Sequence, residues 1–153
     1  MNQYSDKLSA FITKNSIDAR VLVFETSCHS VEEAAQSANA SVDQFVKNIC
    51  TVDLNGHLVI SIIRGKDKLD LKKVSALVGS KLRFATPEEI LEKTGYPAGG
   101  TPSFGYSAKF FIDKKVLEMP LVYSGGGSTT ALTQVKPSEI CRLNNPTIDY
   151  ITK

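Results

Sequence analysis

The sequence has few of the residues from which disulfide-bonded, zinc-binding or membrane-spanning proteins are built. Its three cysteines, Cys28, Cys50 and Cys141, are odd in number and form no Cys-x-x-Cys pair. This argues against a disulfide framework and a thiolate zinc site, and it predicts a reducing, cytoplasmic location. No stretch approaches the roughly 18 apolar residues of a membrane-spanning helix, and the start, MNQYSDKLSAFITK, lacks the pattern of a secretion signal. We therefore expect a soluble, unprocessed chain.

The sequence also lacks nucleotide-binding motifs and a strong excess of one charge. Neither the GKD after Arg64 nor the run GGGSTT completes a P-loop, and no Gly-x-Gly-x-x-Gly follows an expected strand. Kinase and dehydrogenase functions are therefore excluded. Lys and Arg total 18 against 16 Asp and Glu, which gives a formal net charge of +2. This is too small for binding along a long nucleic acid by charge alone, although it permits contacts with a few phosphates.

The length and apolar content predict a single compact domain over residues 1–153. A chain of 153 residues that is 42% hydrophobic can bury most of the surface that its unfolded form exposes, and no linker divides it. The pair Asn55-Gly56 lies between two β-branched runs and predicts an antiparallel hairpin over 46–63, with positive φ at both turn residues. Because expected strands alternate with short helices, the predicted fold class is α+β, with a mixed, mostly antiparallel sheet surrounded by short helices.

Other elements are predicted from apolar spacing and from residues that favour helix ends. Tyr4, Leu8, Phe11 and Ile12 recur at helical spacing and predict a first, amphipathic helix. Further helices are expected, from their capping residues, at Ser30 to Asn39, as a short turn after Ser41, from 71 to 79, from Thr86 to Gly95, and from Pro137 onward. Strands are expected at 20–24, 108–112, 119–123 and 129–135.

Three segments carry residues suited to binding or catalysis. Lys47 stands at the entrance to an expected central strand, where an ammonium group requires either solvent or an anionic partner. The loop GYPAGGTPSFG, residues 95–105, contains four glycines and two prolines, so its backbone amides can approach a ligand closely. The run Gly125–Ser128 either wraps a substrate or closes two strands. By position alone, Lys47 is more simply a solvated lysine at the end of a strand, and Gly125–Ser128 is more simply a hairpin turn. For the loop 95–105, a binding site and a surface turn stay equally open.

The two histidines are weak candidates. His29 follows Cys28 directly, and adjacent residues on an extended chain point to opposite faces, so the two make a poor nucleophile and base. His57 falls in the expected hairpin turn.

Taken in order, these segments resemble the YbaK family and the insertion editing domain of bacterial prolyl-tRNA synthetases. EEAAQSANASVDQFVKN is similar to the family's helix, turn and lysine, and the block from GHLVISIIRGKDKLDL to GYPAGGTPSFG is similar to its central part. FIDKKVLEMPLVYSGGGSTTALTQVKPSEI resembles its closing aspartate, glycine turn, strand and helix. The resemblance covers nearly the whole chain and implies hydrolysis, in trans, of the ester bond of a mischarged aminoacyl-tRNA, without a cofactor or metal.

The resemblance also implies roles for particular residues. Lys47 matches the lysine expected to hold the terminal phosphate or the aminoacyl end, and Gly99, Gly100 and Thr101 match the loop that holds the aminoacyl carbonyl. The family commonly has proline where this sequence has Ser103, which bears on the loop's shape and amino-acid preference. The remaining residues expected to bind the substrate or brace its pocket are Pro102, Ser103, Phe104, Gly105, Asp113 and Gly126.

The expected substrate is a tRNA that carries the wrong small amino acid on its 3′ adenosine, of the Ala- or Cys-tRNA(Pro) type. No side chain in the matched positions is an obvious general base, so the resemblance favours activation of water by a ribose hydroxyl. Two other functions stay open: a non-catalytic module that binds tRNA or an aminoacyl-tRNA synthetase, and a small-molecule-binding domain of the same fold. Five basic residues either contact the acceptor stem of the tRNA or are simply exposed to solvent: Arg64, Lys66, Lys68, Lys72 and Lys73.

Overall fold

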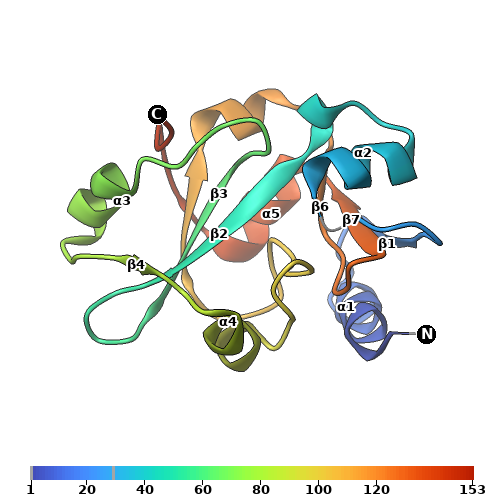
Figure 1. Cartoon of the computed structure of the whole chain (residues 1–153), viewed down its shortest axis with the longest axis horizontal. Coiled ribbons are helices and arrows are strands. Elements are labelled where there is room, and N and C mark those ends of the chain that lie inside the picture. Colours follow the sequence, from blue (N-terminus) through green and yellow to red (C-terminus); the bar gives the residue numbers. More distant parts are fainter. Residues whose placement is uncertain (1, 29) are drawn as a thin grey trace.

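The computed structural model describes residues 2–28 and 30–153 and contains two β-sheets surrounded by helices (Figure 1). The smaller sheet has the strand order β1-β7-β6 and is antiparallel throughout. The larger has the order β4-β2-β3-β5-β8, with parallel pairing only at β3–β5 and β5–β8 among its described strands. The strands are β1 (Ala19–Val23), β2 (Val46–Val52), β3 (Leu58–Arg64), β4 (Arg83–Phe84), β5 (Lys109–Asp113), β6 (Val122–Gly125), β7 (Ala131–Val135) and β8 (Thr147–Asp149). The predicted α+β class with mixed, mostly antiparallel pairing is confirmed, but the strands form two sheets.

The helices are short, and most begin and end where capping residues predicted. They are α1 (Gln3–Lys14), α2 (Val31–Ala38), α3 (Leu71–Val78), α4 (Pro87–Thr94) and α5 (Pro137–Asn144), with 3-10 turns η1 (Val42–Gln44) and η2 (Lys114–Glu118). The Thr86 side chain accepts from the Glu89 amide while the Glu89 carboxylate accepts from the Thr86 amide, and Gly95 ends α4 in the left-handed conformation. Such a cap stabilises a helix by about 1 kcal/mol, which matters for a helix of two turns.

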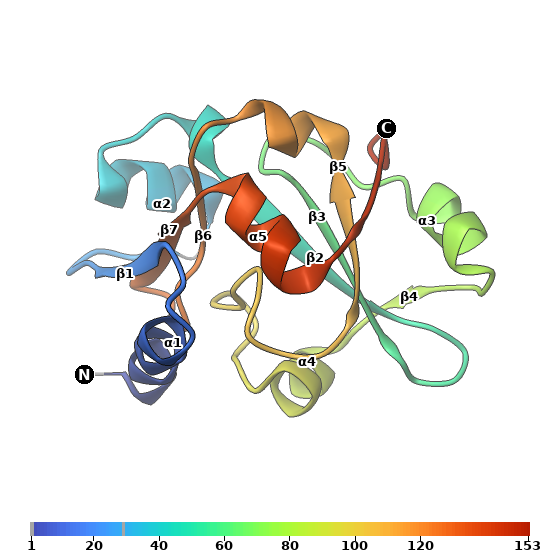
Figure 2. The same cartoon turned by 180° about the vertical axis from the view of Figure 1, so that it is seen from behind.

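The apolar core covers both faces of the larger sheet. On one face, Ile60 of β3 belongs to the cluster that contains Ile140 of α5, and α5 lies across β2 and β3 when the molecule is seen from behind (Figure 2). On the other face, Ile63 packs with Val74 of α3. Because β3 is buried on both sides, its sequence LVISIIR is an almost continuous apolar run rather than an alternating one.

The predicted hairpin is confirmed, but the predicted turn is wrong. Strands β2 and β3 pair from Val46 opposite Arg64 to Val52 opposite Leu58, which leaves a five-residue connection instead of a two-residue turn. Only Gly56 of the Asn55-Gly56 pair has positive φ among the described residues, at 80°. The Asp53 carboxylate explains the longer turn, because its Oδ1 accepts from the amides of Asn55 and His57 at 2.9 Å each.

Three short elements were not predicted, namely β4, η2 and β8. Each is at most five residues long, and β4 and β8 are edge strands of the larger sheet, so none has a long periodic pattern in the sequence. The strand expected at 119–123 begins later, at Val122, because the chain bends at Pro120 and Leu121 after η2. Within the described residues, no helix is long and apolar enough to cross a membrane.

Candidate functional site

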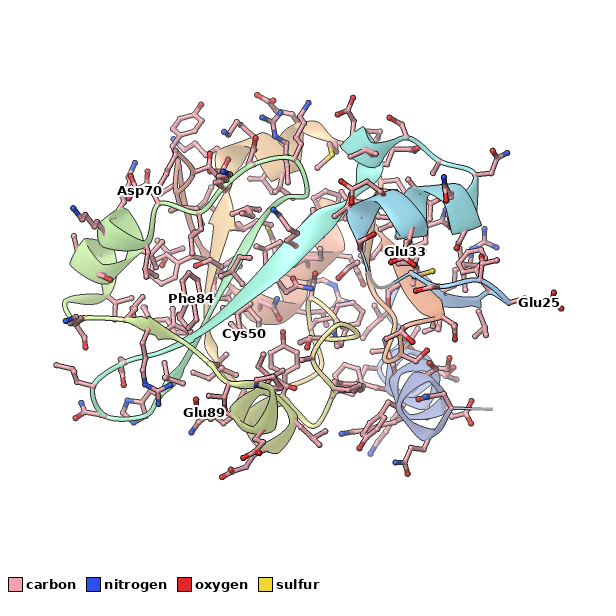
Figure 3. All side chains as sticks on the ribbon, in the orientation of Figure 1. Glu25, Glu33, Cys50, Asp70, Phe84 and Glu89 are labelled. Carbon is pink, nitrogen blue, oxygen red and sulfur yellow. The ribbon has the colours of Figure 1, made fainter. Side chains whose placement is uncertain are left out.

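A cavity of about 400 Å³ lies between β2, α2, β6 and the glycine-rich loop. Its walls come from segments far apart in sequence, and Lys47, Gly99 and Thr101 are among them. The other lining residues are Cys28, Ser30, Val31, Ala34, Phe45, Val46, Asn48, Ile49, Cys50, Phe84, Ala85, Ile90, Ala98, Tyr123, Ser124, Gly125, Ala131 and Leu132. Two of them, Cys50 and Phe84, lie on the neighbouring strands β2 and β4, away from α2 in the view of Figure 3.

The cavity exists because one edge of β2 is only partly covered. Among the described residues, β4 pairs with β2 at Thr51 and Val52 only, and the Ala85 amide donates to the Cys50 carbonyl at 2.9 Å. The rest of that edge, residues 46–49, faces the cavity. The opposite wall belongs to the smaller sheet, which joins the larger one through a parallel bridge between Phe45 and Tyr123, whose rings stack at 5.1 Å.

Glycine allows the loop after α4 to dock closely on the β6–β7 connection. The Gly127 amide donates to the Gly100 carbonyl at 2.7 Å, and a Cβ on Gly100 would lie 2.6 Å from the Ser128 nitrogen. A Cβ on Gly125 would overlap the Thr101 carbonyl. The loop backbone is therefore held against β6 at a distance that only glycine permits.

The amides of the loop differ in whether they are already engaged. The Gly100 amide donates to the Pro97 carbonyl at 3.0 Å and closes a turn. The amides of Gly99 and Thr101 find no acceptor within the described part of the chain, and both residues line the cavity. Two residues of the cavity lining therefore keep an unused amide donor, whereas the Gly100 amide donates within the loop.

Lys47 lies on the cavity wall and is tied to the loop that follows β3. Its Nζ donates to the Asp67 carbonyl at 2.9 Å, and within the described residues it forms no ion pair with a carboxylate. The Asp67 carboxylate is instead bound by Arg64 at 2.7 Å and Lys115 at 3.4 Å, and the Arg64 guanidinium lowers its pKa. The positive charge of Lys47 therefore faces a neutral carbonyl and is available to an anionic ligand.

Beneath the loop, three polar side chains from three segments meet. Asn48 of β2 donates from Nδ2 to the Thr101 carbonyl at 3.0 Å and to Ser124 Oγ of β6 at 3.1 Å. Ser103 Oγ donates to Asn48 Oδ1 at 2.7 Å and lies 2.6 Å from Ser124 Oγ. Sequence reasoning missed Asn48 and Ser124. The available signal was a second polar residue directly after Lys47, near the start of a mostly apolar strand.

The other predicted loop residues form the loop's support rather than the cavity lining. Ser103 and Phe104 are fully buried, and the Phe104 ring packs 6.4 Å from that of Phe11 in α1. The Pro102 carbonyl accepts from the Tyr106 hydroxyl at 2.7 Å. Gly105 has a φ of 102°, which favours glycine. Together these contacts anchor the loop to the core.

Asp113 and Gly126, also predicted to bind or brace the substrate, are both buried and outside the lining. Asp113 Oδ1 accepts from the Lys115 amide at 2.9 Å, and Oδ2 accepts from the Ile151 amide at 2.8 Å. A Cβ on Gly126 would lie 2.5 Å from the Leu132 nitrogen, which explains the glycine. Asp113 thus fixes β5, η2 and the C-terminal segment, and Gly126 fixes the turn before β7.

The cavity offers thiols but, among its described lining residues, no carboxylate. Burial raises the pKa of Cys50 to about 12 and also raises the pKa of Cys28. Both thiols are therefore protonated at neutral pH and are weak nucleophiles. His29, considered with Cys28 as a catalytic pair, lies outside the described residues.

The proposed RNA-binding cluster is partly neutralised. Arg64, Lys66 and Lys73 are paired with the carboxylates of neighbouring aspartates. Lys68 and Lys72 are exposed and form no ion pair with any described residue. No group of three His, Cys, Asp or Glu side chains in the described ranges is arranged to hold a metal ion.

The chain matches a family of editing domains in sequence and a solved protein in fold. A crystal structure titled "a putative trans-editing enzyme for prolyl tRNA synthetase" superposes with a TM-score of 0.91 and 30% identity, covering 100% of this chain and 99% of that one. The family model described as "Aminoacyl-tRNA editing domain" matches residues 25–143. The chain therefore belongs to the aminoacyl-tRNA editing domain family.

Relatives of similar and of much greater length are found. The uncharacterized protein YwhH of Bacillus subtilis is 29% identical over 122 residues, 78% of each chain. The "Putative Cys-tRNA(Pro)/Cys-tRNA(Cys) deacylase EbsC" of Enterococcus faecalis is 25% identical over 126 residues, 80% of this chain and 77% of that protein. Proline–tRNA ligase of Thermosipho melanesiensis is 31% identical over 109 residues, which are 70% of this chain but only 19% of the ligase.

Proposed function

We propose that this protein is an aminoacyl-tRNA deacylase that acts in trans and hydrolyses the ester bond of a tRNA carrying the wrong small amino acid. The observation that carries the proposal is the cavity itself. It brings Lys47 together with the unengaged amides of Gly99 and Thr101, in a chain of the aminoacyl-tRNA editing domain family. The names of EbsC and of the solved structural neighbour support the same reaction class.

The two free amides suit the charge that develops in ester hydrolysis. Water attacks the carbonyl carbon, a C–O bond forms, and the carbonyl oxygen becomes negatively charged in a tetrahedral intermediate. Amides of Gly99 and Thr101 that are in place beforehand would donate to that oxygen. The intermediate then collapses, the bond to the ribose oxygen breaks, and that oxygen takes a proton. The products are the free amino acid and tRNA with an intact 3′ end.

Lys47 would bind the anionic end of the substrate. Its ammonium group faces only a carbonyl in the free protein, so a substrate phosphate could replace or share that contact. We assign it to binding the terminal phosphate or the aminoacyl end, and not to nucleophilic attack.

The attacking water would be activated by the substrate. Among the described lining residues no carboxylate is present, and both thiols are protonated at neutral pH. A ribose hydroxyl next to the ester could accept the water's proton while it passes its own proton to the leaving ribose oxygen, so that the hydroxyl ends neutral. A substrate that lacks this hydroxyl should therefore be hydrolysed much more slowly, and an unchanged rate would exclude substrate assistance.

Editing of this kind meets a physical need. A synthetase pocket gains only about 1–3 kcal/mol from one methylene, so it cannot strongly reject a smaller or near-isosteric amino acid. A second site that hydrolyses the error supplies the missing discrimination. A cavity of about 400 Å³ that also receives the end of the tRNA leaves room for a small side chain, and alanyl- and cysteinyl-tRNA(Pro) are the substrates we propose to test first.

The test is to follow ester loss from a panel of correctly and incorrectly charged tRNAs, with the native protein and Lys47→Ala. A matched control is Lys81→Ala, which removes an exposed lysine outside both the cavity lining and the basic cluster. Release of one mischarged species that is lost in Lys47→Ala and kept in Lys81→Ala would establish editing. No acceleration across the panel, with salt-dependent tRNA binding, would favour a binding module instead.

A further inference from the structure

The polar group beneath the glycine loop is a closed ring of hydrogen bonds. It consists of Asn48 from β2, Ser103 from the loop and Ser124 from β6, joined by contacts of 3.1, 2.6 and 2.7 Å. Ser103 is fully buried and Ser124 is 2% exposed, so water competes little for these bonds. We refer to these residues as the Asn48–Ser103–Ser124 ring.

The Thr101 carbonyl determines which way the Asn48 amide faces. A carbonyl only accepts, so the atom of Asn48 that lies 3.0 Å from it must be the Nδ2 donor. Oδ1 then faces Ser103, whose single hydroxyl proton is used in donating to it. The bond between the two serines must therefore run from Ser124 to Ser103. The hydrogen bonds of the ring therefore all run in one direction: Asn48 donates to Ser124, Ser124 donates to Ser103, and Ser103 donates to Asn48.

This arrangement leaves Asn48 with no free donor. Both Nδ2 protons are used, one on the Thr101 carbonyl and one on Ser124. Although Asn48 and Ser124 line the cavity, their hydroxyl and amide protons are directed into the protein. The ring is thus unsuited to donate to a substrate and suited to hold three cavity walls together.

We infer that Asn48, Ser103 and Ser124 are positioning residues, which hold the Gly99–Thr101 segment where its two free amides can bind a developing oxyanion. This inference rests on the proposed function. The bond to the Thr101 carbonyl fixes the peptide directly, and a second anchor comes from α5, where Asn144 Nδ2 donates to the Ser103 carbonyl at 2.6 Å. Binding to an oxyanion is sensitive to small displacements of the donors, so the ring should act on kcat.

Ser103 is the member for which the sequence departs from the proline expected by family resemblance. Proline or alanine at this position would remove the hydroxyl and leave Asn48 Oδ1 and the Ser124 proton without partners in a buried site. In this chain, the rigidity that a proline would give the loop is supplied by the ring instead.

The experiment compares kcat and KM for hydrolysis of the mischarged tRNA identified by the panel, using Ser103→Ala, Ser124→Ala and their double variant. We expect a roughly tenfold or larger loss of kcat for each single variant, with KM little changed, as for loss of a buried hydrogen bond that acts on the transition state. Because a ring fails as a unit, the double variant should lose little more than either single one. Additive losses, or losses confined to KM, would overturn the inference.

Two controls separate positioning from general damage. Ser124→Thr keeps the hydroxyl and suits a strand, so it should retain most of kcat, and a loss equal to that of Ser124→Ala would contradict the role of the hydroxyl. Ser61→Ala removes another fully buried serine, whose hydroxyl has no partner among the described residues, and should leave kcat unchanged.

A readout without substrate keeps the inference independent of the proposed function. Amide hydrogen exchange of the peptide that spans residues 97–105 should be faster in Ser103→Ala than in the native protein and in Ser61→Ala. Unchanged exchange would show that the ring does not hold the loop. Faster exchange in a protein that hydrolyses none of the charged tRNAs would overturn the catalytic role and the proposed function while leaving the structural role intact.

Discussion

Lys47 and Asp67 are joined by a hydrogen bond of 2.9 Å from the lysine Nζ to the aspartate backbone carbonyl. The side chain of Asp67 does not line the cavity, but it is bound by Arg64 and Lys115. These two contacts fix the loop that carries the carbonyl. The position of the cavity lysine is therefore set by a carboxylate that a substrate would not touch.

Asp67→Asn should reduce the acid sensitivity of the fold. The pKa of Asp67 is lowered, chiefly by Arg64, so its stabilising contribution is complete above the unfolded pKa of about 3.9 and is lost as pH falls through the folded pKa. The free energy of unfolding should therefore fall less for Asp67→Asn than for the native protein between about pH 6 and about pH 3. Urea unfolding at both pH values measures this. Asp43→Asn, at an exposed ion pair with Lys66, is the control and should match the native pH dependence.

Gly125→Ala should damage both stability and the site. The added methyl overlaps the Thr101 carbonyl, so β6 or the loop must move, at a cost of about 1–3 kcal/mol. Denaturant unfolding and deacylation assays should both register the change. Gly56→Asn is the comparison, because a Cβ there meets nothing within 4 Å and asparagine tolerates positive φ. Native-like hydrolysis by Gly125→Ala would mean that the close approach of the loop is unimportant.

Asp113→Ala should destabilise the protein without changing which charged tRNA is hydrolysed. It leaves the buried Ile151 amide and the Lys115 amide without acceptors, which should cost about 2–4 kcal/mol. Asp113→Asn, which keeps one acceptor oxygen, should lose less. The free energy of unfolding and the order of preference across the tRNA panel are the two measurements. If the variant prefers a different charged tRNA under conditions where it is fully folded, Asp113 takes part in the substrate site.

Cys50 should react with iodoacetamide far more slowly than Cys141. Burial raises the pKa of Cys50 to about 12, so the thiolate is scarce at neutral pH, and the residue is itself buried, whereas Cys141 is partly exposed. Mass spectrometry of peptides after timed alkylation gives the order of modification. Fast labelling of Cys50 at neutral pH would show a reactive thiolate in the cavity and would reopen covalent catalysis.

The parts of the fold that depend on local chemistry were predictable from the sequence. Thr86, Glu89 and Gly95 bound α4 as expected, because a cap requires only residues a few positions apart. The Asn55-Gly56 turn was mispredicted because Asp53 supplies an acceptor that makes a longer turn favourable. Short edge strands were missed because two or three residues carry no periodic pattern.

The candidate site was predictable only where a segment had an unusual composition of its own. Lys47 and the glycine loop could be named, since an ammonium at a strand entrance and four glycines in eleven residues are visible locally. The partnership of Asn48 with Ser103 and Ser124 joins positions 55 and 76 residues apart. An asparagine in one strand, a serine in another and a serine in a loop are common, and only their proximity in the folded chain distinguishes them.

The walls of the cavity belong to two different sheets, which meet where Phe45 pairs with Tyr123. The width of the cavity therefore depends on how the two sheets pack against each other, as well as on the residues that line it. Laboratory evolution for a larger or smaller amino acid should accordingly select substitutions at distant core positions such as Leu8 and Ile140 in addition to lining residues. The amino-acid preference of the cavity should then depend on the packing of the whole interior, and not on the lining residues alone.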